Sequence, residues 1–262
     1  MNNLVVSDQY IAACVKSLNE YELGDAVAIR PRSIFTLGDT VEEPSKGSIV
    51  GEGILSFSGG LSGVNRSDAQ NAFLFASLVA NKAFPEESQG KEWYAEFRDV
   101  MRKAGWTHIK SYYNDLHISG TSVRMDKLVL EILGSVVAGI ALPGPTTALM
   151  LKVAGEAIAA LQKRDTELTV YERNLLAQGV GGIAAGACTE HNGVTIMALG
   201  AVRFLRTNTS TKVLFVDVDT RDVKLYRGET FFEKNDLVAA ATREVIASKL
   251  IAHAGKIADY DI

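Results

Sequence analysis

The sequence predicts an α+β fold, in which a largely antiparallel sheet is packed with helices, including a central apolar helical hairpin. Apolar residues recur at helical spacing through much of the first two thirds of the chain. The last third contains long alternating segments of strand type, followed by one closing helix. Helices and hairpin strands in this order are typical of α+β proteins, whereas regular strand–helix alternation would indicate a parallel sheet.

The chain is expected to begin with a helix in "SDQYIAACVKSLNEYELG". Ser7 or Asp8 is a suitable N-cap, and Gly24 is a suitable end. Residues 26–53 lack a clear period and are expected to form irregular strands and loops.

Residues 54–84 predict a strand, a glycine turn and a helix, with Ser67 or Asp68 as the N-cap. A second helix is predicted over 90–105, where apolar residues again recur at helical spacing. The β-branched and aromatic segment 106–120 then favours a strand.

The most apolar part of the chain is residues 128–161, which contain twenty uncharged residues between Glu131 and Lys152. The "PGP" at 143–145 interrupts this stretch, because proline cannot continue a helix. The sequence therefore predicts a helical hairpin with arms of about fifteen residues, shorter than the roughly 20 that span a bilayer. Two interpretations stay open: buried core helices, or a hairpin that enters a membrane or lines an apolar ligand tunnel.

Residues 193–228 predict two long strands joined by a polar turn near 207–211. An amphipathic helix is expected to close the chain, capped by Asn235 or Asp236 and ended by Gly255.

The overall composition excludes several classes of function. The net charge is −4 and there is no Lys/Arg-rich run, so nucleic acid is not an expected partner. The two cysteines and four scattered histidines have neither disulfide-framework nor metal-site spacing, so no metal ligand is assigned. The N-terminus lacks a Sec-type signal pattern, which fits synthesis in the cytoplasm and leaves later export, release or membrane association open.

The segment "GVGGIAAGACTEHNG", residues 179–193, places Cys188 behind a run of small residues. Such a run either leaves space for a ligand or lets backbone pack closely around an inert, buried cysteine. Nearby Glu190 and His191 suggest an activated thiolate. On a strand, however, His191 faces away from Cys188 and Glu190 raises the thiol pKa, so no catalytic residue is assigned.

The chain resembles the Erwinia virulence factor (Evf) family in the order of its features. These features are N-terminal helices, the apolar hairpin, the Gly/Ala-rich segment with one cysteine, the long strands and the final helix. The resemblance implies a single domain over 1–262 and a palmitoyl group, a fatty acyl thioester, on a buried cysteine. Cys188 matches that cysteine in position, with 74 residues after it. The family is associated with bacterial virulence in an insect host and has no established enzymatic activity.

A buried acyl chain is compatible with the residues present. At ~0.8 kcal/mol per methylene, burying sixteen carbons contributes at most about 12 kcal/mol. The expected pocket residues comprise small ones beside the cysteine and apolar ones on the hairpin: Gly182, Ala185, Gly186, Leu133, Val137, Leu149 and Val153.

The sequence therefore favours a non-enzymatic virulence factor that carries a fatty acyl chain on Cys188 and makes at most transient membrane contact. A first alternative is a membrane-active or pore-forming insecticidal toxin that uses the hairpin 128–161. A second is a cysteine acyltransferase or thioesterase with Cys188 as nucleophile, so whether the chain is an enzyme stays open.

Overall fold

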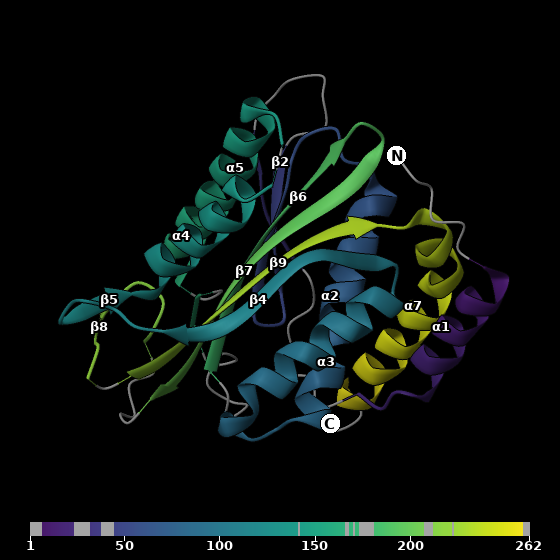
Figure 1. Cartoon of the computed structure of the whole chain (residues 1–262), viewed down its shortest axis with the longest axis horizontal. Coiled ribbons are helices and arrows are strands. Elements are labelled where there is room, and N and C mark those ends of the chain that lie inside the picture. The colour runs from purple at the N-terminus through teal and green to yellow at the C-terminus, as the bar shows by residue number, and fades with distance from the viewer. Residues whose placement is uncertain are drawn as a thin grey trace.

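A computed structural model describes residues 7–23, 32–37, 45–140, 142–165, 168–169, 171–172, 181–206, 212–221 and 223–258. A twisted sheet lies between two layers of helices, with α4 and α5 over one face and α2 and α3 over the other (Figure 1). The helices α1 and α7 pack together on the outside of the second layer. The predicted α+β class, with a mostly antiparallel sheet and an apolar helical hairpin, is confirmed.

The main sheet has seven strands in the order β1-β2-β3-β6-β7-β9-β4. All neighbouring pairs are antiparallel except β3 and β6, which are parallel. A small separate sheet pairs β5 with β8. The strands are β1 Arg32–Leu37, β2 Ser45–Val50, β3 Gly53–Phe57, β4 Trp106–Leu116, β5 Ser122–Arg124, β6 Gly181–His191, β7 Val194–Arg206, β8 Asp217–Asp219 and β9 Val223–Lys234.

Two hydrophobic cores lie on the two faces of the sheet, one under α4 and α5 and the other under α2 and α3. Side chains of β6 and β7 enter both cores, because successive residues of a strand point to opposite faces. The helices are α1 Asp8–Glu20, α2 Gly63–Ala83, η1 Glu87–Gln89, α3 Gly90–Lys103, α4 Met125–Ala138, α5 Gly144–Gln162 and α7 Asp236–Ala258.

Several of the expected helix boundaries are confirmed, whereas the predicted end of α7 at Gly255 is wrong, because the helix continues to Ala258. The Ser7 hydroxyl accepts from the Tyr10 backbone N–H and caps α1, and the Asn235 side chain accepts from Val238 N–H in α7. The proline-containing break separates α4 from α5. The expected end of α1 at Gly24 is wrong, because the helix ends at Glu20 and the extended backbone of Tyr21 follows it. No helix in the described ranges combines the length and apolar content that crossing a bilayer requires.

The predicted N-cap of α2 is wrong. The helix begins at Gly63, and the Ser62 hydroxyl accepts from the Asn65 backbone N–H. Ser67 and Asp68 therefore lie inside the helix. The Asp68 carboxylate can then form ion pairs with Lys and Arg side chains of other helices and strands.

The second long strand predicted after residue 206 is also wrong in part. Residues 212–216 do not pair with the sheet, and the turn at 207–211 lies outside the described residues. The backbone N–H groups of Val213 and Leu214 donate to the buried Glu172 carboxylate at 2.9 and 3.0 Å instead of to a neighbouring strand. After β7, the next described segment that pairs with the main sheet is β9.

Candidate functional site

Cys188 lies near the end of β6, between Phe57 of β3 and Met197 of β7 in the strand register. Its side chain belongs to the core under α2 and α3 and is only 1% exposed. Burial away from charge raises the pKa of the Cys188 thiol well above its usual value. The thiol is therefore protonated at neutral pH and is a poor nucleophile.

The residues predicted to line one acyl pocket lie on two different faces of the sheet. Gly182 and Gly186 share the face of Cys188, because their numbers differ from 188 by even steps. Ala185 belongs to the opposite core, together with Leu133 and Val137 of α4. A common tunnel between Cys188 and the hairpin is therefore not formed.

The remaining two hairpin candidates, both on α5, differ in exposure. Val153 is buried, whereas Leu149 is 39% exposed to solvent. Leu149 thus reaches the surface, and its role toward a lipid stays a prediction.

Other side chains occupy the space that the small residues of β6 leave open. A Cβ atom on Gly186 would lie 2.5 Å from the Leu55 Cδ2 atom, and one on Gly182 would lie 3.2 Å from the Arg203 Cζ atom. A nearby cavity lined by Gly182 and Ala184 has a volume of about 10 Å³, room for about one water. This geometry favours the close-packing interpretation, and an acyl chain would need side chains of α2 and α3 to move.

The acidic and basic neighbours of Cys188 do not form a catalytic arrangement with it. His191 lies on the opposite side of β6, where its Nε2 atom is 3.0 Å from the Asn192 side-chain nitrogen. Glu190 is exposed. No group of three or more potential metal ligands occurs in the part of the chain that the structure describes.

The Cys188 thiol is expected to react with a thiol reagent such as DTNB only as fast as the protein unfolds, because it is buried and protonated. The measurement is the labelling rate of a Cys14→Ser variant with and without denaturant. Rapid labelling of the folded variant would contradict this burial. A chain acylated at Cys188 would instead gain the label only after unfolding and hydroxylamine treatment.

The end of the helical hairpin presents an uncharged surface. We call residues 138–140 and 142–149 the hairpin tip. Its exposed residues are small, apolar or proline: Ala138, Gly139, Pro143, Gly144, Pro145, Ala148 and Leu149. Ile140 and Leu142 are half-buried against the core. The residues of the tip itself carry no charge, and Lys110 Nζ of β4 lies beside Gly139.

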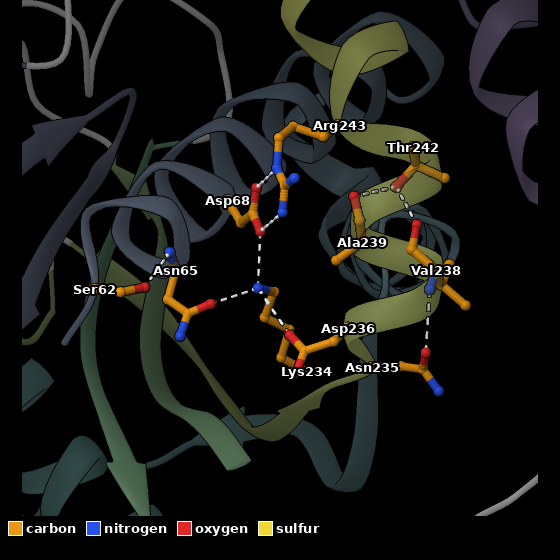
Figure 2. A network of polar contacts seen from close by, with 10 residues as sticks. All are labelled: Ser62, Asn65, Asp68, Lys234, Asn235, Asp236, Val238, Ala239, Thr242 and Arg243. Carbon is orange, nitrogen blue, oxygen red and sulfur yellow. Dashed lines mark hydrogen bonds and ion pairs between the residues drawn. The ribbon is translucent and has the colours of Figure 1, made fainter. Parts of the chain in front are cut away.

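A buried ionic network ties α2 to β9 and α7 (Figure 2). The Asp68 carboxylate lies 2.8 Å from Lys234 Nζ and accepts two hydrogen bonds from Arg243, at 2.7 and 2.8 Å. Lys234 Nζ also lies 3.0 Å from Asp236 and donates to Asn65. Burial by itself raises the pKa of Asp68, but the hydrogen bonds from Arg243 and Lys234 outweigh it and lower that pKa below its usual value.

A second buried ion pair lies toward the opposite end of the neighbouring strand, β7. Arg203 of β7 has a side chain only 3% exposed, and its Nη2 atom donates to Glu52 Oε1 at 2.6 Å. Its guanidinium carbon lies 3.3 Å from the centroid of the Trp93 ring in α3. Burial raises the pKa of Glu52 even though the Arg203 charge opposes that change.

Sequence reasoning missed both ion clusters. A weak signal existed for Arg203, since it is the first charged residue of an otherwise apolar strand beginning at Val194. No local signal existed for Asp68 and Lys234, because these residues are 166 positions apart and meet only when α2 packs beside β9.

Comparisons with known proteins add little. No family model matches the chain, and no curated protein matches it. A solved structure named as a delta-endotoxin is similar with a TM-score of 0.39 and 11% identity, over 79% of this chain and 90% of that chain. A likeness at this level carries no argument about function. These comparisons do not test the resemblance to the Evf family or the acylation of Cys188, which stay predictions.

Proposed function

We propose that this protein acts on lipid bilayers and that the hairpin tip is the part that contacts the membrane. The observation that carries the proposal is the twenty-residue uncharged stretch between Glu131 and Lys152, whose central part is exposed rather than buried. An exposed uncharged segment loses no ion solvation when it enters the apolar part of a bilayer.

The packing of the hairpin against the sheet also supports this proposal. The core beneath α4 contains three alanines of the sheet, Ala185, Ala187 and Ala198, beside larger side chains such as Val202 and Phe231. A Cβ atom on Gly200 would lie 2.6 Å from the Leu133 backbone nitrogen, so α4 rests almost directly on the backbone of β7. At the alanine positions the hairpin buries less apolar area than it would against large side chains.

Residues of β4 beside the tip have the composition of a membrane interface. Tyr112 and Ile109 are exposed, and Lys110 and Tyr112 line a shallow hollow together with Ile140. Tyrosine and lysine gather where a protein passes from the apolar part of a bilayer to its head groups. The apolar tip and this interfacial strand are therefore suited to meet a membrane together.

Replacing Leu149 with glutamate is expected to reduce dye release from phospholipid vesicles by at least about tenfold, because a charge then enters the apolar contact. Leu237→Glu is the matched control, since Leu237 is an exposed leucine on α7, in the other helical layer. That control should release dye like the unchanged protein. Circular dichroism checks that both variants are folded.

The proposal fails if the unchanged protein neither binds nor permeabilises vesicles over a wide range of lipid concentrations. It also fails if the two leucine variants lose the same activity, because the loss would then not depend on the hairpin tip.

A further inference from the structure

The guanidinium of Arg203 lies between two flat surfaces. The Trp93 ring covers one face at 3.3 Å, and on the Gly182 side a Cβ atom would lie 3.2 Å from Cζ and 3.3 Å from Nη1. A side chain at position 182 would push the guanidinium by a few tenths of an ångström. The Arg203 charge is therefore held rigidly and out of bulk water.

Two donors of this cation have no hydrogen-bond partner among the described residues. Glu52 accepts from Nη2, whereas the buried Nε and Nη1 atoms of Arg203 meet no acceptor in the part of the chain that the structure describes. A buried donor on a charged group that lacks an acceptor costs about 1–3 kcal/mol or more. Such atoms in a folded protein call for an explanation, and an ion or water bound beside them is the common one.

Arg203 lines the cavity of about 10 Å³ that also contacts Glu52, Trp93, Gly182 and Ala184. The space accommodates about one species of water size. Among the described residues, the buried side-chain atoms of this cavity wall that lack a partner are donors only, Nε and Nη1 of Arg203. An anion satisfies donors without needing acceptors in return, whereas a water would have two hydrogens of its own to place.

We propose that this cavity is a binding site for one small monatomic anion, held by the Nε and Nη1 donors of Arg203 beside Trp93. Glu52 is close enough to oppose a second negative charge, so the anion binds weakly while Glu52 is ionised. This site is separate from the hairpin tip, and its test does not depend on the bilayer proposal.

Trp93 provides the first test, because bromide bound beside its ring would quench its fluorescence. The chain has two tryptophans, so a Trp106→Phe variant reports Trp93 alone and a Trp93→Phe variant reports Trp106 alone. Both rings are buried, which keeps bulk bromide away. We expect saturable quenching of Trp93, reversed by chloride but not by the larger sulfate, and no saturable quenching of Trp106.

A Glu52→Gln variant provides the second test. Glutamine keeps an oxygen that accepts from Arg203 Nη2 but removes the opposing charge, so bromide affinity should rise by at least about tenfold. The melting temperature of this variant should rise with sodium chloride at constant ionic strength and not with sodium gluconate. The contrary result is linear bromide quenching that is equal for both tryptophans, with a melting temperature that does not depend on chloride in the unchanged protein or in Glu52→Gln. This result would mean that only an ordered water occupies the cavity, and it would overturn the proposal.

Discussion

Replacing Asp68 with alanine is expected to lower the free energy of unfolding by about 3–5 kcal/mol, the cost of breaking a buried ion pair from one side. Asp68 is the shared partner of Lys234 and Arg243, and the Lys234 side chain is only 2% exposed. Without the carboxylate, Lys234 keeps Asp236, whose side chain is 72% exposed and therefore a weak partner. Urea unfolding followed by circular dichroism measures the change.

Asp236→Asn is the matched control, because it removes an acidic partner of the same lysine at the surface. We expect its free energy of unfolding to change by no more than about 0.5 kcal/mol. Equal losses for the two variants would contradict the assignment of Asp68 as the centre of the network.

The same carboxylate gives the stability a dependence on acid. The pKa of Asp68 is lower in the folded chain than in the unfolded chain, where it is about 3.9. Its contribution is therefore fully present above the unfolded-state pKa and is lost as the pH falls through the folded-state pKa. The acid-induced decrease in stability should be smaller in Asp68→Ala than in the unchanged protein.

Replacing Gly200 with alanine is expected to destabilise the protein by about 1–3 kcal/mol, because the added methyl group overlaps α4. That Cβ atom would lie 2.6 Å from the Leu133 backbone nitrogen and 2.9 Å from its Cα atom. Backbone atoms in a helix cannot rotate away as a side-chain end can, so α4 must shift from the sheet. The free energy of unfolding measures the cost, and vesicle dye release should rise if the hairpin leaves its seat during bilayer contact.

Gly134→Ala tests the same helix without the overlap. A Cβ atom at Gly134 would meet only Leu151 Cδ2, at 4.0 Å. Alanine is favoured over glycine inside a helix by about 1 kcal/mol, so this variant should be slightly stabilised. If Gly134→Ala loses as much stability as Gly200→Ala, the overlap between position 200 of β7 and α4 is not the cause of the destabilisation.

Some features of the candidate sites could be predicted from neighbouring residues in the sequence, and others could not. The hairpin 128–161 was predictable because its uncharged stretch and its prolines act over neighbouring positions. The buried state of Cys188 agrees with the small residues around it. Which residues it meets was not predictable, since its neighbours Phe57 and Met197 belong to other strands. The ion pair between Arg203 and Glu52 joins positions 151 residues apart and left only a weak local trace.

The fold class, the apolar hairpin and the starts of α1 and α7 were predictable from the sequence alone, because helix periodicity, caps and proline breaks depend on residues a few positions apart. Only the tertiary structure decided that the hairpin and Cys188 lie on opposite faces of the sheet. That separation follows from the alternation of side chains along β6, which sends Ala185 and Cys188 to different cores once β3 and β7 hold the strand in place. The pairing of charges far apart in the chain was decided in the same way, by which elements pack together.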